Sequence, residues 1–135
     1  MEMKATILLA GIFLVSCANA SSTEKGDAHS FRVEKYELNE EHGCRRSDIN
    51  VNADRAREFF RRSREVEHRV IHDSYDIAPC SVYGAVMHKG KECRWNINAG
   101  GTGWISCGEG PSVQIQYFAC DNCDDLLTFK DAKTR

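Results

Sequence analysis

The stretch from Cys80 to Cys123 constrains the fold most, because alternation, turn residues and cysteine positions agree there. It contains four runs of alternating side chains, separated by glycine-containing segments that are typical of hairpin turns. The predicted strands are Cys80–His88, Glu92–Asn98, Gly103–Cys107 and Val113–Ala119. This spacing predicts an antiparallel meander.

The register of the meander follows from its turns, because a one-residue slip would move every side chain to the opposite face. A two-residue first turn sets Gly84 opposite Trp95, where the glycine leaves room for the indole ring. Centring the second hairpin on Gly100 places Trp95 opposite Ile105. A third loop of about five residues then places Ile105 opposite Ile115. The resulting apolar inner face consists of Val82, Val86, Cys93, Trp95, Ile97, Ile105, Cys107, Val113, Ile115 and Tyr117.

The other face of this sheet carries a row of aromatic and amide side chains. In the predicted register Asn96 lies opposite both Tyr83 and Trp104, and Trp104 lies opposite Gln116. Exposed aromatic rings beside amides are typical of binding surfaces, because they combine apolar contact with hydrogen bonding. We therefore predict a binding surface made of Tyr83, Asn96, Trp104 and Gln116. The alternatives are that the N-terminal leader or the C-terminal tail covers the row, or that the row is half-exposed and has no binding role.

One helix is predicted before the meander. From Asn52 to about Val70, apolar side chains recur every three or four residues, which is the pattern of one helix face. Asn52 is a suitable N-cap because its side chain can accept a hydrogen bond from the first helical turn. Alternation with charge predicts an edge strand over Phe31–Leu38, and loops are predicted over 39–48 and 72–79.

The first twenty residues have the pattern of an export signal, with Lys4 followed by an apolar run and then by small residues. Leu14-Val15-Ser16-Cys17 resembles the lipobox of bacterial lipoproteins. The resemblance implies that Cys17 is lipidated and becomes the first residue of the mature chain. The segment Ala18-Asn19-Ala20 fits an ordinary signal peptidase instead, and that alternative predicts a soluble periplasmic or secreted protein.

These patterns divide the chain into four parts. They are a signal peptide over 1–16 (1–20 without lipidation), a flexible tether over 17–30, one domain over 31–125 and a C-terminal tail over 126–135. The lipobox predicts a protein of the cell envelope that is lipid-anchored and faces the periplasm or the cell surface.

Export makes disulfides the expected state of the remaining cysteines, because the compartments reached by exported proteins are oxidising. Without Cys17 their number is six, and an even number can pair completely. The meander register pairs Cys93 with Cys107 and leaves three connectivities for the other four cysteines. The layout of the strands favours the pairs Cys44–Cys80 and Cys120–Cys123.

Cys120-Asp121-Asn122-Cys123 is the motif that most resembles an enzyme site, that of a thiol oxidoreductase. Such a site usually opens a helix, whose dipole lowers the thiol pKa. Here the motif follows a strand, and neighbouring carboxylates raise a thiol pKa, so a structural disulfide is favoured. A zinc site would require four ligands, and a single CxxC does not supply them. We predict no catalytic residue, no metal ligand and no cofactor.

Together the elements predict an α+β fold, in which one helix packs on a disulfide-stapled antiparallel meander sheet of four to five strands. The order of strand, helix and four strands is similar to that of cystatin-like folds, and the resemblance is one of layout only. The glutamine-led inhibitory motif of cystatins is absent, and the nearest segment is Cys80-Ser81-Val82-Tyr83-Gly84. The resemblance therefore implies no inhibitory role.

The predicted function is that of an exported envelope lipoprotein acting as a non-enzymatic binding module, such as an inhibitor or an immunity-type protein. Its partner is expected to be an unknown protein or another envelope macromolecule, besides the membrane that a lipid anchor contacts. A net charge of -2 and a pI near 6.2 argue against nucleic acid. The alternatives are an envelope thiol-disulfide oxidoreductase that uses the pair Cys120–Cys123, and a structural component of the cell surface.

Overall fold

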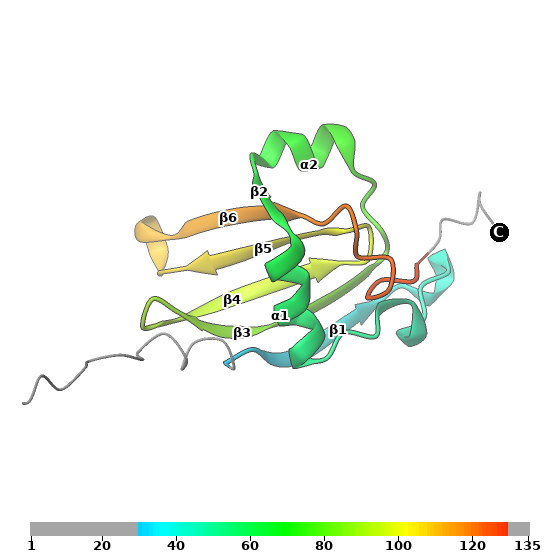
Figure 1. Ribbon diagram of the computed structural model, residues 1–135, viewed down its shortest axis with the longest axis horizontal. Coiled ribbons are helices and arrows are strands. Elements are labelled where there is room, and N and C mark those ends of the chain that lie inside the picture. Colours follow the sequence, from blue (N-terminus) through cyan, green and yellow to red (C-terminus); the bar gives the residue numbers. More distant parts are fainter. Residues whose placement is uncertain (1–29, 130–135) are drawn as a thin grey trace, which may run out of the picture.

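A six-stranded antiparallel sheet forms the centre of the part of the chain that the computed structural model describes, residues 30–129 (Figure 1). Across the sheet the order is β1 (Arg32–Leu38), β3 (Cys80–His88), β4 (Lys91–Asn98), β5 (Thr102–Cys107), β6 (Gln114–Ala119) and β2 (Arg64–Val66). The helices are α1 (Ala53–Arg62) and α2 (His68–Ser74), and the 3-10 turns are η2 (Glu40–His42), η3 (Arg46–Ile49) and η4 (Gly110–Ser112). The predicted α+β class is confirmed, with one more helix and one more strand than expected.

The first two hairpins have the predicted register. Gly84 lies opposite Trp95, and Trp95 lies opposite Ile105. A glycine is required here because a Cβ atom at this position would lie 2.4 Å from the indole ring and 1.9 Å from the carbonyl oxygen of Arg32. The edge strand β1 pairs antiparallel with β3, as the sequence predicts.

The third hairpin differs from the prediction by one residue. Ile105 lies opposite Gln116 instead of Ile115, so the loop holds the six residues 108–113. The turn η4 accommodates the additional residue. Gly108, two residues before this turn, has a φ of 91°, a conformation that glycine adopts without strain. Because side chains alternate along a strand, this shift turns every β6 residue to the face opposite the predicted one.

The shift brings Phe118 into the core and turns Tyr117 outward. The Phe118 ring lies edge-on against Phe60 of α1, with 5.3 Å between the centroids. Ile115 and Val113, which were predicted for the inner face, are 47% and 40% exposed. The prediction of an inward Tyr117 is also wrong. Phenylalanine fills the core more favourably than tyrosine, whose hydroxyl would need a buried partner.

Helix α1 begins where the sequence predicts. The N-cap Asn52 accepts a hydrogen bond from the backbone N–H of Arg55 at 2.9 Å. However, the helix ends at Arg62, far short of the predicted end near Val70, because Ser63 adopts an extended backbone. The next three residues form β2, which pairs with β6 and satisfies backbone groups that would otherwise be an open sheet edge.

The second helix, α2, occupies residues 68–74 and includes part of the segment predicted as the loop 72–79. In Figure 1 α1 lies in front of the strands, whereas α2 lies beyond β6 at the top of the view. The buried residue of α2 is Ile71. His68 and Ile71 of α2 line one cavity with Trp104 and Tyr117, so α2 lies close to the face of the sheet that α1 leaves free.

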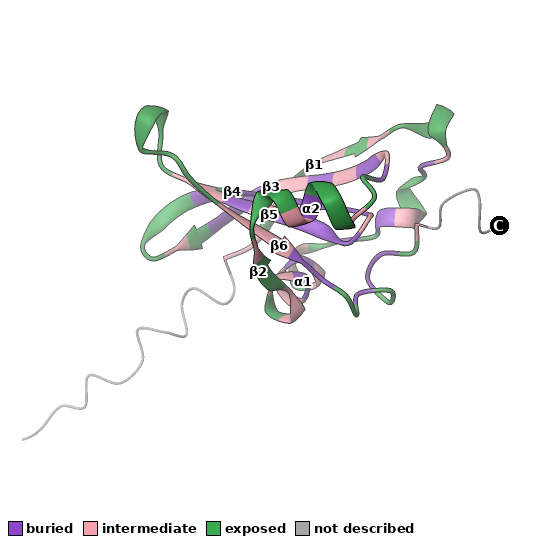
Figure 2. Ribbon diagram, turned by 90° about the horizontal axis from the view of Figure 1, so that it is seen from above, coloured by how far each residue is buried: buried purple, intermediate pink, exposed green. Residues whose placement is uncertain are grey.

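The core lies on the inner face, which we define as the face of the sheet that carries Trp95. Trp95 is fully buried, its ring lies 6.2 Å from that of Phe60, and its indole N–H donates to the carbonyl oxygen of Ala85 at 2.9 Å. Figure 2 shows the long buried segments of β3 and β4. Leu126 and Leu127, placed in the predicted C-terminal tail, are buried in the same core.

The three predicted disulfides are present, and they are Cys44–Cys80, Cys93–Cys107 and Cys120–Cys123. The second links the neighbouring strands β4 and β5 and thereby fixes the register of the hairpin between them. Cys17, the predicted signal peptide and the tether up to residue 29 lie outside the described residues.

Candidate functional site

The outer face, which carries Trp104, is hollowed into a groove of about 440 Å³ between the strands β3 to β6 and helix α2. Its lining has a distinctive chemistry. None of the thirteen lining residues is Asp, Glu, Lys or Arg, although these types make up 28% of the chain. The lining residues that carry rings are His68, Tyr83, Trp104 and Tyr117, and those with other hydrogen-bonding side chains are Ser81, Asn96, Asn98, Thr102 and Ser106.

The structure places three of the four residues of the predicted binding surface in this groove, namely Tyr83, Asn96 and Trp104. Gln116 belongs to the inner face because of the shift in the third hairpin. Tyr117 takes its place opposite Trp104. The predicted row of two aromatic and two amide side chains is thus a row of three aromatic side chains and one amide.

Aromatic rings follow the groove from one side to the other. The rings of Tyr83 and Trp104 lie 6.3 Å apart at an interplanar angle of 62°. Tyr117, the strand neighbour of Trp104, lies 4.7 Å from the ring of His68 on α2. The rings therefore come from β3, β5, β6 and α2 as two pairs, which are neighbours because Trp104 lies opposite Tyr117, and we call these four side chains the aromatic row.

Tyr83 contributes an uncharged hydroxyl at the end of this row. Burial raises the pKa of Tyr83, and a hydrogen bond with Glu37 raises it further. The carboxylate of Glu37 is held ionised because a hydrogen bond from Lys35 lowers its pKa, and Glu37 is not part of the lining. The charges of Glu37 and Lys35 are thus paired with each other.

Two buried asparagines in the lining differ in their hydrogen bonding. Asn98 forms four hydrogen bonds of 2.8–3.1 Å, two of them with the backbone of Ala78. Asn96, which is 6% exposed, forms only a long one, from Nδ2 to the carbonyl oxygen of Val82 at 3.4 Å. Among the described residues no fully buried side-chain oxygen or nitrogen lacks a partner, so the unpaired Oδ1 of Asn96 is open to the groove. Asn98 stabilises the fold, whereas Asn96 presents free hydrogen-bonding capacity.

Several lining residues were not identified from the sequence, and they are His68, Ile71, Ser106, Ile115 and Tyr117. Ile115 and Tyr117 were missed because of the register of β6, and His68 and Ile71 because α2 was predicted as the end of one long helix and a loop. Ser106 stands on β5, whose predicted register is the observed one, and it was not singled out. One available signal was Phe118. Placing this phenylalanine on the inner face would have given the observed register.

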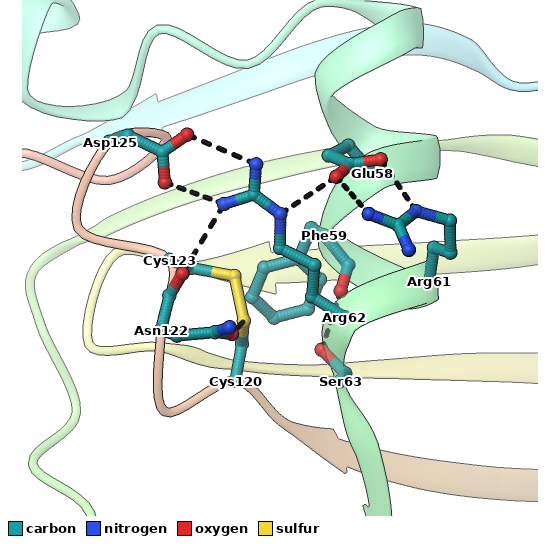
Figure 3. Close-up of polar contacts among 9 residues, drawn as sticks. All are labelled: Glu58, Phe59, Arg61, Arg62, Ser63, Cys120, Asn122, Cys123 and Asp125. Carbon is teal, nitrogen blue, oxygen red and sulfur yellow. Dashed lines mark hydrogen bonds and ion pairs between the residues drawn. A yellow bond between two sulfur atoms is a disulfide. The ribbon is translucent and has the colours of Figure 1, made fainter.

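The Cys120–Cys123 disulfide is held close to α1 by Arg62 (Figure 3). The guanidinium of Arg62 donates to the carbonyl oxygen of Asn122 at 3.2 Å and to both carboxylate oxygens of Asp125 at 2.6 and 3.1 Å. Its Nε donates to Glu58 at 2.8 Å. This cluster, which we call the Arg62 clamp, fixes the segment 122–125 on the helix.

The surroundings of this disulfide favour a structural role. Cys120 and Cys123 are 6% and 3% exposed, so an attacking thiolate has little access to either sulfur. Hydrogen bonds from Tyr75 and then Arg64 lower the pKa of Asp121, which stays ionised between the two cysteines. A negative charge at this place disfavours the thiolate that exchange chemistry requires.

A larger hollow, of about 800 Å³, lies at the end of the sheet beside this disulfide. It is bordered by the loop 75–79, by Gly100 and by the last described residue, Phe129. Within residues 30–129 no group of three or more His, Cys, Asp or Glu side chains is arranged to hold a metal ion. The lining of this hollow mixes acidic side chains, Asp76 and Asp124, with apolar ones, so it does not specify one ligand chemistry in the way that the uncharged groove does.

We expect acid to loosen the Arg62 clamp. Hydrogen bonds from Arg61 and Arg62 lower the pKa of Glu58 from 4.5 to about 2, and Arg62 also lowers the pKa of Asp125. Because these values are depressed in the folded state, their stabilising effect is complete above about pH 4.5 and is lost as the pH falls toward 2. The melting temperature of the protein should fall across this window.

The control for the clamp is the double variant Arg61→Met/Arg62→Met. In that variant the pKa of Glu58, followed by NMR of its carboxyl carbon, should return toward 4.5. A pKa of Glu58 that stays near 2 without the two arginines would show that another group lowers it.

No family model matches the chain, and no curated protein or solved structure matches it either. Among residues 30–129 no helix is long and apolar enough to cross a membrane. The groove must therefore be interpreted from its own chemistry.

Proposed function

We propose that the protein is an exported, membrane-anchored binding module that is not an enzyme and whose ligand occupies the groove of the outer face. The observation that carries the proposal is the uncharged groove itself, with its aromatic row and the unpaired Oδ1 of Asn96. Concave sites lined by aromatic side chains with a few polar groups are the usual form of ligand pockets, and about 440 Å³ lies within their usual range.

The rigidity of the groove supports this proposal. Asn96 and Trp104 stand on neighbouring strands that the Cys93–Cys107 disulfide links covalently. Binding to a pre-formed site costs less conformational entropy than binding that must first order its contact residues. A stapled sheet therefore suits a protein whose task is to hold a ligand.

Anchoring at the envelope is the second part of the proposal, and it depends on Cys17. We expect the wild-type protein in the membrane fraction and in the detergent phase after phase partitioning. Cys17→Ser should yield a soluble protein cut after Ala20, because the Ala18-Asn19-Ala20 site remains intact. Wild-type protein found wholly in the soluble fraction would contradict the lipid anchor.

The binding part is tested with fractions of the envelope, namely purified cell wall, extracted lipids and periplasmic proteins. Wild-type protein should be retained by one of them, and Trp104→Ala should reduce retention about tenfold because a central aromatic contact is removed. Gln116→Ala is the matched control, since Gln116 neighbours Tyr117 in the chain but belongs to the opposite face. Retention by no fraction, or equal retention of the two variants, would contradict the proposed site.

A further inference from the structure

We propose that the groove binds an uncharged saccharide chain, an inference that rests on the proposed function and specifies its ligand. The groove offers no charge to a charged ligand. A charged ligand that enters the groove loses water and meets no opposite charge, because the lining contains no acidic or basic side chain apart from the imidazole of His68. This lining complements a neutral ligand.

The lining of the groove is uncharged but polar. The lining includes Asn96, whose Oδ1 is unpaired, and Trp104, Ser106 and Tyr117, whose indole N–H and hydroxyls have no hydrogen-bond partner among the described residues. A purely apolar ligand would cover these groups and leave them unpaired, at a cost in free energy for each. The ligand must therefore be neutral and also rich in hydrogen-bonding groups.

The aromatic row suits the two kinds of surface that a sugar ring has. Tyrosine and tryptophan rings offer apolar faces that favour contact with C–H groups, and their hydroxyl and N–H groups favour polar contacts at the ring edge. A saccharide has both features in each unit, since its ring carries C–H groups on its faces and hydroxyls around its rim. Hydroxyls also donate and accept, so they can pair with the mixture of donors and acceptors in this lining.

The length of the aromatic row indicates the size of the ligand. The rings of Tyr83 and Tyr117 stand on strands that are three positions apart in the sheet, β3 and β6. Three strand spacings amount to about 14 Å, which is the extent of a short chain of sugar units and more than a single ring needs. We therefore infer a chain of several units laid across the strands, with Trp104 at its centre.

The test is calorimetric titration of the purified full chain, kept in a detergent without a sugar headgroup. The probes are two neutral trimers, of N-acetylglucosamine and of glucose, and a cationic one, of glucosamine. At least one neutral trimer should bind. Comparing the dissociation constants of the two neutral trimers shows whether the groove prefers the acetylated sugar or glucose. The glucosamine trimer should bind at least tenfold more weakly than the better neutral trimer, because each unit carries an ammonium group for which the groove has no partner.

The variants locate the bound trimer. Trp104→Ala, Tyr117→Ala and Asn96→Leu should each weaken binding of the neutral trimer about tenfold or more, whereas Gln116→Ala should bind as the wild type does. Thermal melts identify any variant that fails to fold, and Asn96→Leu is the safest of the three because Asn96 forms only one long hydrogen bond. Undiminished binding in the folded variants would overturn the inference.

The inference also fails if neither neutral trimer binds, or if the glucosamine trimer binds as well as they do. That failure is distinct from failure of the proposed function. If the protein binds neither neutral trimer but is still retained by periplasmic proteins, and Trp104→Ala reduces that retention, it is still a binding module. Its partner would then be a protein and not a saccharide.

Discussion

Trp95→Ala is expected to lower the free energy of unfolding by about 3 to 5 kcal/mol, as is typical when a large buried aromatic side chain is removed. The Trp95 side chain is fully buried and packs against Phe31 and Phe60. Its indole N–H donates a hydrogen bond to the carbonyl oxygen of Ala85. Its loss leaves both a cavity and an unpaired acceptor. Urea denaturation followed by circular dichroism measures the change.

The control is Trp104→Ala, in the neighbouring strand but on the other face of the sheet. Trp104 is only part-buried and makes no hydrogen bond to a described residue, so its removal should leave the melting temperature nearly unchanged. A loss of stability equal to that of Trp95→Ala would show that Trp104 is a core residue. The outer face would then lose its role as a binding surface.

Removal of the Cys93–Cys107 disulfide is expected to cost about 3 kcal/mol of stability, since it closes a loop of moderate length. The two cysteines are 14 residues apart in sequence and link β4 to β5. Without the bond the unfolded chain gains entropy, and replacing Cys93, which is 1% exposed, by alanine also leaves a small cavity in the core. Cys93→Ala/Cys107→Ala, unfolded in urea beside the wild type, gives the value.

The Cys120–Cys123 disulfide provides the comparison for this loss. It closes a loop with a sequence separation of only 3, so Cys120→Ala/Cys123→Ala should cost clearly less than the first pair. A larger loss for the second pair would mean that chain entropy does not account for either disulfide.

The first two hairpins could be predicted from the sequence because independent signals agreed. The two-residue turn, the space that Gly84 leaves for Trp95 and the pairing of Cys93 with Cys107 all specify one register. The N-cap of α1 at Asn52 was also identifiable, since its role depends only on residues next to it in sequence.

The third hairpin could not be fixed in the same way. Residues 113–119 alternate between two sets that are both partly apolar, so the inward face depends mainly on the loop length, and Phe118 is the residue that favours the observed set. That length is set by the 3-10 turn η4, which local sequence does not distinguish from a shorter loop. For this reason Tyr83, Asn96 and Trp104 were placed correctly on the outer face, and Gln116 was not.

The end of α1 illustrates a different limit. The helical spacing continues through Val66 and Val70, yet the chain leaves the helix after Arg62 and pairs with β6. The gain from covering a sheet edge is a tertiary effect that periodicity does not contain. The contribution of α2 to the groove, through His68 and Ile71, was therefore not predictable.

The central claim, that the outer face binds the ligand, is tested most directly by the two indole N–H signals in the NMR spectrum of the nitrogen-15-labelled protein. The chain has only two tryptophans, one on each face of the sheet. Addition of the envelope fraction that retains the protein should shift the signal of Trp104 and leave that of Trp95 in place. An unmoved Trp104 signal, with the protein bound, would contradict the claim.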